Sequence, residues 1–393
     1  MKQSPRFVDK QFPNHICLLK KAIYGWKQAP REWFSTFSAY LIQYGFRSSS
    51  ADPSLLLFNH NSIQLYILVY VDDILLTGNS TSEIDNLLTA LHVRFSMRNL
   101  GPVSQFLGLQ ITSTATGLHL AQSIYATSIL HKAGMVDCKP VSTPLPTKFL
   151  RNEQSDDLYE RPEHYHQITG ALQYLMITRP DLLYAVNFLC QHMHQPLQTH
   201  YNLLKRVLRY VKVTLSLGLP IRPTSLQLTG YADSDWAADH LDRRSITGYC
   251  AFLGHNLISW IVKKQSSVTR SSTEAEYRPL STATCDLIWL RRLLAKFQSI
   301  QTEPTKLYCD NVSALALATN PVFHARTKHI EIDAHFIRDC VRTKQLSVHH
   351  ICSQDQPAGL FTKSLSSTRH LQLCDKITIQ PSIVILREAD KNK

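Results

Sequence analysis

The chain has 393 residues, 44% of them apolar, which is enough for two or three domains with full cores. Its formal charge of +12 favours a polyanionic partner, because lysine and arginine release counterions from phosphate backbones, although a merely basic soluble protein stays open. Nine scattered cysteines without a Cys-x-x-Cys pair exclude a disulfide framework and a zinc knuckle.

The sequence shows no feature of a secreted or membrane protein. The N-terminus is polar and basic, without the apolar stretch of a signal peptide. The longest apolar run is interrupted by Asp72 and Asp73 and is shorter than the ~20 residues of a membrane span. We therefore expect a protein of a reducing compartment, cytoplasmic or nuclear, with no membrane partner; the oligomeric state stays open.

The first part of the chain alternates helical and strand patterns. Apolar and aromatic residues recur every three or four positions over residues 30–46, which predicts an amphipathic helix. Residues 54–78 indicate three strands joined by tight turns, and a helix follows over 82–95. Residues 103–122 indicate a hairpin, and residues 139–165 a linker or surface loop.

Three helices are predicted next, near 166–178, 180–194 and 199–213. The third carries basic side chains at helical spacing, namely Lys205, Arg209 and Lys212. This stripe could lie along phosphates, and an ordinary solvated helix face is an equal alternative.

A new pattern starts near residue 225. Three short strands are predicted over about 226–234, 247–254 and 257–264, followed by a long helix over 272–297. Then come a strand (305–310), two helices (311–319 and 328–342), a strand (345–352) and a last short helix from about 355. Three strands followed by alternating helix and strand predict a mixed sheet covered by helices.

Two adjacent carboxylates, Asp72 and Asp73, stand between two apolar strands. Burying an unpaired carboxylate is costly, so a pair in this setting suggests a metal ion. Phosphoryl transfer uses metal ions held by carboxylates at such rigid positions. The alternative is an ordinary acidic turn, because aspartate is a common turn residue.

The residues around this pair resemble copia-type reverse transcriptases. Tyr70-Val71-Asp72-Asp73 matches the family's catalytic signature, and residues 19–34 resemble its template- and nucleotide-positioning motif. The resemblance implies a palm domain in which Asp72 and Asp73 hold Mg²⁺ (or Mn²⁺) and the partners are an RNA template and a DNA primer.

The same resemblance places Gln28 and Arg31 near the incoming nucleotide or the template. The family has a further metal-binding aspartate, together with the fingers, upstream of the region that resembles residues 1–12. Since a two-metal site without a bridging ligand should bind its ions poorly, we expect the isolated chain not to polymerise DNA.

Three more carboxylates occur in the order of a ribonuclease H fold. Asp233 lies on the first strand, Glu276 on the long helix and Asp310 at a later strand end, each within a motif that resembles the copia family. The resemblance implies that they hold divalent ions that activate water against the RNA of an RNA–DNA hybrid. For Asp310 alone, a helix N-cap is an equal alternative.

Local patterns separate some of these residues from their neighbours. Asp235 lies on the same strand face as Asp233, so periodicity cannot distinguish them. Glu276 continues the apolar stripe of its helix, which predicts a buried carboxylate, whereas Glu274 fits a capping role with Ser271.

A basic segment near residue 326 resembles the family's approach to its late helix. Its residues Arg326, Lys328 and His329 could contact substrate phosphates, and an ordinary basic helix start is an equal alternative.

Two departures from the family pattern weaken the expected nuclease. Gly359 stands where the family has its fourth carboxylate, and Asp355, four residues earlier, could either reach the site or only cap a helix. Pro279 lies inside the long helix, where it should kink the helix at a cost of ~3 kcal/mol.

We therefore predict an α+β and α/β multidomain chain. A partial reverse-transcriptase palm covers 1–145, a thumb- or connection-like helical region 146–222, an RNase H-like mixed sheet flanked by helices 223–370, and a tail 371–393. The predicted function is a retrotransposon reverse transcriptase/RNase H fragment impaired in both activities. A non-catalytic basic nucleic-acid-binding remnant and an unstable pseudogene product are the alternatives.

Overall fold

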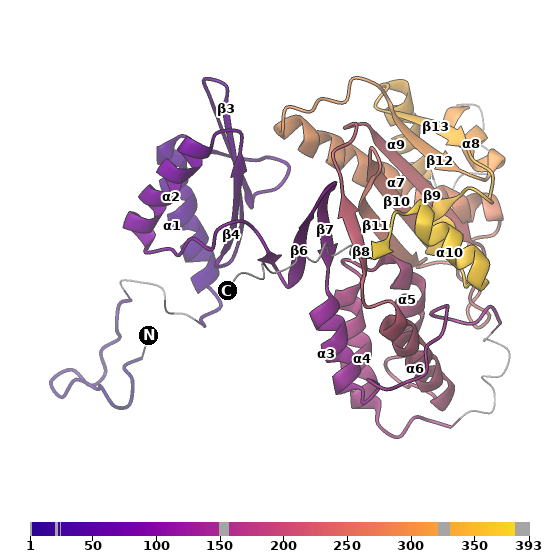
Figure 1. Cartoon of the computed structure of the whole chain (residues 1–393), viewed down its shortest axis with the longest axis horizontal. Coiled ribbons are helices and arrows are strands. Elements are labelled where there is room, and N and C mark those ends of the chain that lie inside the picture. The colour runs from indigo at the N-terminus through magenta and orange to yellow at the C-terminus, as the bar shows by residue number, and fades with distance from the viewer. Residues whose placement is uncertain (1, 20–22, 24, 149–156, 321–330, 382–393) are drawn as a thin grey trace, which may run out of the picture. The chain divides into compact units, whose positions relative to one another are not determined.

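The computed structural model describes the chain except residues 1, 20–22, 24, 149–156, 321–330 and 382–393 (Figure 1). The chain divides into two compact units, Met1–Val103 and Ser104–Lys393. The predicted phosphate contacts Arg326, Lys328 and His329 fall outside the described residues. Among the helices that are described, none is long and apolar enough to cross a membrane.

The first unit is an antiparallel sheet with two helices on one face (Figure 1). Its elements are α1 (Ala29–Tyr44), β1 (Arg47–Ser48), β2 (Leu55–His60), β3 (Ile63–Tyr70), β4 (Asp73–Gly78) and α2 (Thr81–Phe95). The core forms where Phe37 and Leu41 of α1 and Leu87 of α2 pack against Leu65 and Ile67 of β3. The strands and helices predicted between residues 30 and 95 are therefore confirmed.

The second unit contains a cluster of the helices α3 (Ser123–Lys132), α4 (Pro162–Leu175), α5 (Leu183–Gln191) and α6 (Gln198–Val213). The short 3₁₀ helix η2 (Pro180–Leu182) directly precedes α5. Helix α3 was not predicted. The basic stripe of α6 faces the protein: Arg209 Nε donates to the Lys139 carbonyl oxygen at 2.6 Å, and Lys212 Nζ donates to the Val136 carbonyl oxygen. Lys205 Nζ lies 5.0 Å from the ring centre of Tyr201.

A small sheet joins distant parts of the second unit. It contains β5 (Gln105–Phe106), β6 (Leu109–Thr114), β7 (Gly117–Ala121), β8 (Leu217–Ile221) and β14 (Gln380–Pro381), in the order β14-β8-β7-β6-β5. The β6–β7 hairpin confirms the prediction for 103–122, but its pairing with β8 places it in the second unit. The structural boundary therefore follows Val103, whereas the predicted palm extends to residue 145.

The largest sheet is mixed. Its strands are β9 (Leu228–Asp235), β10 (Ile246–Leu253), β11 (Asn256–Lys264), β12 (Thr305–Cys309) and β13 (Leu346–His350). The order is β11-β10-β9-β12-β13; β9, β10 and β11 pair antiparallel, and β12 pairs parallel with both β9 and β13.

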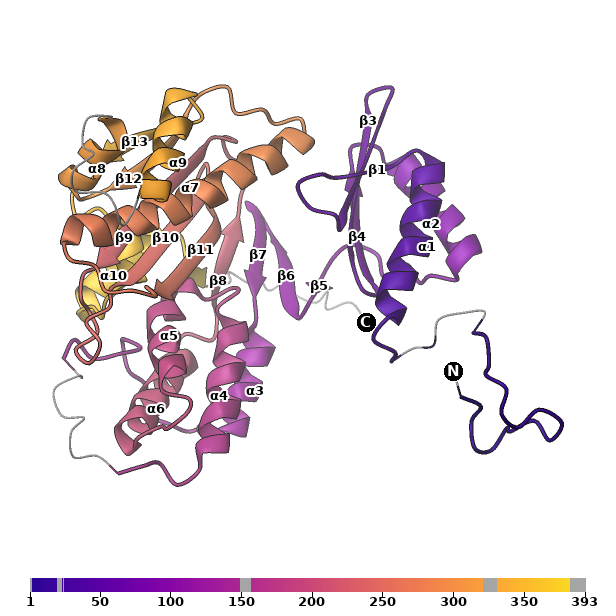
Figure 2. The same cartoon turned by 180° about the vertical axis from the view of Figure 1, so that it is seen from behind.

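Helices cover both faces of this sheet. Helices α7 (Ser272–Lys296), α8 (Val312–Thr319) and α9 (Glu331–Arg342) pack on one face (Figure 2). The 3₁₀ helix η3 (Pro357–Leu360) and helix α10 (Ser367–Lys376) pack on the other. Side chains alternate between the two faces along a strand. Ala232 of β9 therefore lies in the core under α7, whereas the neighbouring Tyr231 packs against the core under α10. The predicted mixed sheet flanked by helices is thus confirmed.

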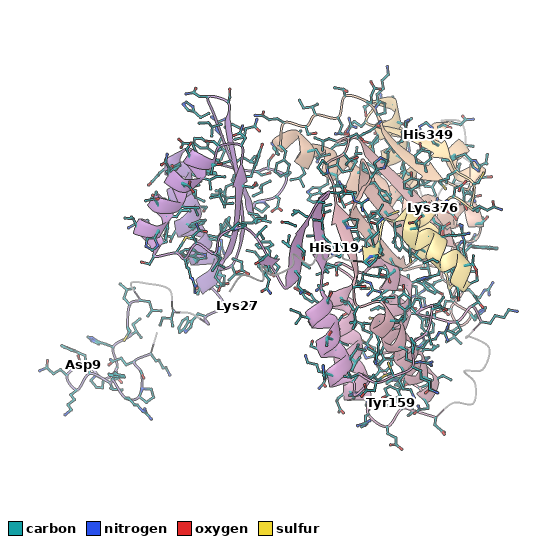
Figure 3. The ribbon with its side chains drawn as sticks, viewed as in Figure 1. Asp9, Lys27, His119, Tyr159, His349 and Lys376 are labelled. Atoms are coloured by element: carbon teal, nitrogen blue, oxygen red, sulfur yellow. The ribbon has the colours of Figure 1, made fainter. Side chains whose placement is uncertain are left out.

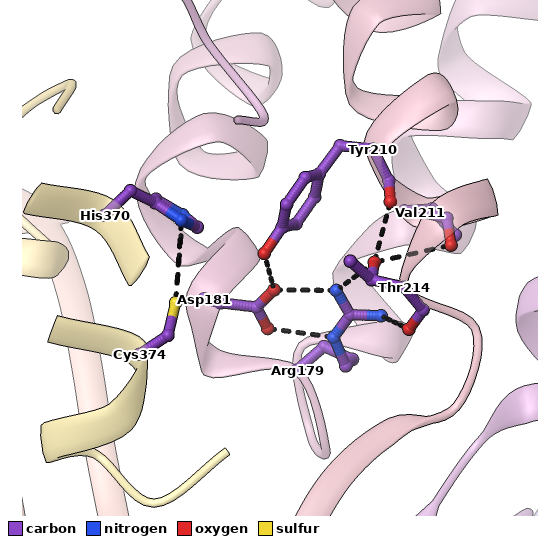
Figure 4. Close-up of polar contacts among 7 residues, drawn as sticks. All are labelled: Arg179, Asp181, Tyr210, Val211, Thr214, His370 and Cys374. Carbon is purple, nitrogen blue, oxygen red and sulfur yellow. Dashed lines mark hydrogen bonds and ion pairs between the residues drawn. The ribbon is translucent and has the colours of Figure 1, made fainter. Parts of the chain in front are cut away.

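A buried ion pair lies where the helical cluster meets helix α10 (Figure 4). The Arg179 guanidinium binds the Asp181 carboxylate through Nε–Oδ1 at 2.9 Å and Nη2–Oδ2 at 2.6 Å, and Arg179 Nη1 also donates to the Thr214 carbonyl oxygen. The Tyr210 hydroxyl donates to Asp181 Oδ2 at 2.8 Å, and its ring packs edge-on against His370 of α10. Tyr210 thus connects the ion pair to helix α10.

Candidate functional site

The Asp72–Asp73 pair lies at the turn between β3 and β4, as predicted. Tyr70 pairs with Asp73, and the turn places Val71 at a φ of 53°. This left-handed conformation is strained for a β-branched residue. The Trp33 indole Nε1 donates to the Val71 carbonyl oxygen at 2.7 Å, so helix α1 fixes the turn. Both carboxylates are exposed rather than buried.

The other predicted polymerase residues lie at the start of helix α1. Gln28 occupies the N-cap position and Arg31 the first turn, and both side chains are exposed. Within the described parts of the chain, no group of three or more potential metal ligands includes Asp72 or Asp73. The described residues of this unit therefore do not assemble a metal site around the pair.

A second group of carboxylates comes together at the mixed sheet. Ligand atoms of Glu276, Cys309 and Asp310 lie within 4.8 Å of one another. The Cys309 thiol points to Glu276 Oε2 at 3.8 Å. Asp310 follows β12 directly, and its Oδ2 accepts a hydrogen bond from the Ser353 hydroxyl at 2.6 Å. The N-cap of α8 is the next residue, Asn311, so Asp310 does not serve as that cap.

Asp233 approaches this group from strand β9. It pairs with Gly248 of β10, and its side chain is almost completely buried. A Cβ at Gly248 would lie 2.8 Å from Thr362 Cγ2 and 2.9 Å from Phe361 Cβ. Only glycine at this position lets the chain after η3 approach so closely, and this contact brings Thr362 and Lys363 beside Asp233.

The start of helix α7 orients Glu276. Ser271 caps the helix by accepting a hydrogen bond from the Glu274 amide at 3.2 Å, and Glu274 accepts one from the Arg270 amide. Glu276 is 7% exposed. The predicted division of roles, with Glu274 in the cap and Glu276 on the buried face, is confirmed.

The electrostatic environment links the three carboxylates. Burial raises the pKa of Glu276 to about 9, and the neighbouring charges of Asp233 and Asp310 add to the effect. Burial also raises the pKa of Asp235, which Asp233 reinforces and Lys363 opposes. The closeness of these acidic groups disfavours their simultaneous ionisation, and a bound cation would remove that penalty.

Lys363 supplies one positive charge to the group. Its Nζ lies 3.4 Å from Asp233 Oδ2, and the Thr362 hydroxyl donates to the same oxygen. Burial would lower the pKa of Lys363, but the charges of Asp233, Asp235 and Asp310 raise it above its ordinary value. The ammonium group is therefore held charged beside the carboxylates.

The position of the absent fourth carboxylate lies in the same place. A Cβ at Gly359 would lie 3.8 Å from Asp233 Oδ2 and 3.6 Å from Lys363 Cε, which is ordinary contact. Asp355 instead pairs with Lys376 of α10 (labelled in Figure 3) at 2.7 Å, and its carboxylate is exposed. Asp355 thus forms an ion pair away from the group, and its side chain does not cap η3, because Gln356 does.

The donor set fits a hard divalent cation. Carboxylate oxygens from Asp233, Glu276 and Asp310 are the ligands that Mg²⁺ and Mn²⁺ prefer. Burial raises the pKa of the Cys309 thiol, so this residue lines the site as a neutral group. Sequence reasoning assigned no role to Thr362 and Lys363; both lie within the motif around Gly359, and their contact with Asp233 depends on the approach at Gly248.

Comparisons with known proteins find similar sequences over most of the chain. Residues 1–147 match the family described as reverse transcriptase (RNA-dependent DNA polymerase). The chain is 44% identical over 380 residues to the retrovirus-related Pol polyprotein from transposon RE2 of Arabidopsis thaliana, covering 96% of this chain and 26% of that protein. It is 32% identical over 281 residues to a transposon Ty5-1 protein of Saccharomyces cerevisiae, covering 70% of this chain and 91% of that protein.

Among solved structures, the chain is similar to LC11-RNase H1 in complex with an RNA/DNA hybrid, with a TM-score of 0.28 and 14% identity, over 35% of this chain and 94% of that chain. The chain spans about a quarter of the length of the transposon RE2 polyprotein. The family match, the identity to the yeast transposon protein and the share of that protein that is covered lead to one conclusion. The chain belongs to the family of copia-type retrotransposon Pol polyproteins.

Proposed function

We propose that the second unit is a metal-dependent ribonuclease acting on RNA–DNA hybrids, impaired by the absence of a carboxylate at residue 359. The observation that carries the proposal is the close group of Glu276 from α7 with Cys309 and Asp310 at the end of β12. Asp233 of β9 lies near enough for its charge to raise the pKa of Glu276. A divalent ion bound there supplies a Lewis acid for phosphodiester hydrolysis. Mg²⁺ or Mn²⁺ is the expected ion.

The chain's own residues would orient and limit the reaction. Ser353 fixes the Asp310 carboxylate, and Thr362 fixes that of Asp233, so that two ligands are held before an ion binds. Such outer contacts raise the precision of a metal site. Because residue 359 is glycine, the fourth carboxylate is missing. A side chain at this position would have room, since its Cβ would contact Asp233 without a clash.

The test is cleavage of a hybrid with labelled RNA by the purified full chain, in Mg²⁺ and in Mn²⁺. We expect slow cleavage that Glu276→Gln lowers by at least about a hundredfold. Asp355→Asn is the matched control, because it removes a carboxylate that lies outside the group. Gly359→Asp should raise the rate. Cleavage that persists undiminished in the Glu276→Gln chain contradicts the proposal.

A second function, hybrid binding without cleavage, is favoured by the contact between Lys363 and Asp233, which already neutralises part of the group. The same assay separates the two functions. Salt-sensitive hybrid binding with no metal-dependent cleavage, even in the Gly359→Asp chain, supports binding alone.

For the first unit we propose that Asp72 and Asp73 act in nucleotidyl transfer only with a further carboxylate ligand. The support is their exposure and the lack of a third potential ligand near them within the described residues. Primer extension with Mg²⁺ or Mn²⁺ is the test, and we expect no incorporation by the chain alone. Robust nucleotide incorporation contradicts this proposal.

A further inference from the structure

Lys363 lies where a cation would bind Asp233. Its Nζ is 3.4 Å from Asp233 Oδ2, and the Asp233 side chain is 2% exposed whereas that of Lys363 is 42% exposed. The Thr362 hydroxyl donates to the same oxygen. Two donors of this chain therefore already occupy Oδ2, and one of them is a full positive charge.

The Lys363 side chain is less enclosed than that of Asp233. Its side chain reaches the carboxylate from the solvent side, on a flexible four-carbon stem, whereas Asp233 is fixed in strand β9. A metal ion can therefore gain Asp233 only if the ammonium group moves away or the ion accepts a positive neighbour. Either route weakens metal binding.

Gly359 lies beside both partners of this contact. A side chain at residue 359 would begin 3.6 Å from Lys363 Cε and 3.8 Å from Asp233 Oδ2, in contact with both partners. With glycine, residue 359 offers no carboxylate to Lys363, whose ammonium group contacts Asp233.

We propose that Lys363 is an internal cation that competes with the divalent metal ion for Asp233 and so sets the metal affinity of the site. This inference rests on the proposed function in one respect, because it takes Asp233, Glu276 and Asp310 as metal ligands. In this proposal Lys363 is not a metal ligand and acts on the site through Asp233. Its removal should strengthen metal binding, whereas loss of a lysine elsewhere should not.

The experiment measures Mn²⁺ binding to the full chain by calorimetry and by electron paramagnetic resonance of free Mn²⁺, without nucleic acid. We expect Lys363→Gln to lower the Kd for Mn²⁺ by about tenfold, since a positive charge in contact with a ligand is lost. Lys363→Arg keeps the charge and should keep the weak affinity. Lys376→Gln is the control: it removes the same charge from an exposed pair with Asp355 and should change the Kd by less than about twofold.

A second variant covers a folding defect in Lys363→Gln. Lys363→Met keeps most of the apolar stem, and circular dichroism of each variant checks the fold. The Mn²⁺-induced rise in Tm gives an independent measure of affinity, because a ligand stabilises the state that it binds. Unchanged or weaker Mn²⁺ binding in both the Gln and Met variants overturns the inference.

Glu276→Gln separates this inference from the proposed function. If it abolishes Mn²⁺ binding while Lys363→Gln leaves the Kd unchanged, the metal site stands and the role of Lys363 is wrong. If Glu276→Gln has no effect on Mn²⁺ binding, the carboxylates are not the ligands and both proposals fail.

Discussion

The side-chain amide of Gln265 donates a hydrogen bond of 3.0 Å to the carbonyl oxygen of Ala275. In an uninterrupted helix that carbonyl would accept from residue 279, but Pro279 has no N–H. Gln265, which directly follows β11, supplies the missing donor from outside the helix. Helix α7 accordingly continues through the proline, from Ser272 to Lys296, and the start that carries Glu276 stays attached to the rest.

This compensation can be measured. We expect Pro279→Ala to raise the free energy of unfolding by less than the ~3 kcal/mol of an uncompensated helical proline. Gln265→Ala should cost about 1 kcal/mol more in the natural chain than in the Pro279→Ala chain, where the Ala275 carbonyl has a backbone partner. Urea unfolding of the natural chain, the two single variants and the double variant gives the coupling energy. A coupling near zero would show that Gln265 does not compensate.

The buried pair of Arg179 and Asp181 should be essential for the second unit. Asp181→Asn leaves the Arg179 charge buried without its partner, so we expect a loss of about 3–5 kcal/mol in unfolding free energy. The matched control is Asp339→Asn, which breaks an exposed pair with Arg342 and should cost less than about 1 kcal/mol. Equal losses in the two variants would mean that burial does not decide the value of the pair.

Histidine protonation should destabilise the helical cluster in mild acid. Burial, together with the stacked ring of His200 and the charge of Lys264, lowers the pKa of His192 to about 4, against the opposing charge of Asp239. Between this value and the ordinary value near 6.5, the unfolded chain binds a proton that the folded chain does not. Stability should therefore fall as pH drops through this window and level off, for this group, below about pH 4.

The measurement is urea unfolding of the natural chain and His192→Gln at steps between about pH 7 and pH 4. The difference between the two chains should change with pH by at most about 1.4 kcal/mol per unit. Parallel stability curves across the window would show that His192 titrates alike in both states.

Sequence patterns predicted those parts of the fold that depend on local periodicity. The order of strands and helices from 226 to 352, the burial of Glu276 and the capping role of Glu274 all follow from spacing within one segment. Sheet pairing over long separations does not. Strand β8 pairs with β7 although about a hundred residues separate them in the sequence. This pairing assigns the β6–β7 hairpin to the second unit, so that the first unit ends at Val103.

The candidate site shows the same limit. Motifs identified Asp233, Glu276 and Asp310, because each lies in a recognisable segment of its own. The contact of Lys363 with Asp233 depends on the absence of a side chain at Gly248, more than a hundred residues away in sequence. No pattern within either segment indicates that contact.

The basic stripe on α6 provides the last prediction. Its helical spacing allowed a phosphate-binding face, but Arg209 and Lys212 donate to backbone carbonyls of the segment around residues 136–139. Each phosphate contact contributes about 0.9 to the slope of log affinity against log salt for duplex DNA. We therefore expect Arg209→Ala and Lys212→Ala to lower the unfolding free energy by about 1 kcal/mol each, and to leave the salt slope of hybrid binding unchanged. A salt slope that falls by about one per substitution would instead support phosphate binding by these residues. In that case the Arg209 and Lys212 side chains would have to leave their carbonyl partners to reach the nucleic acid.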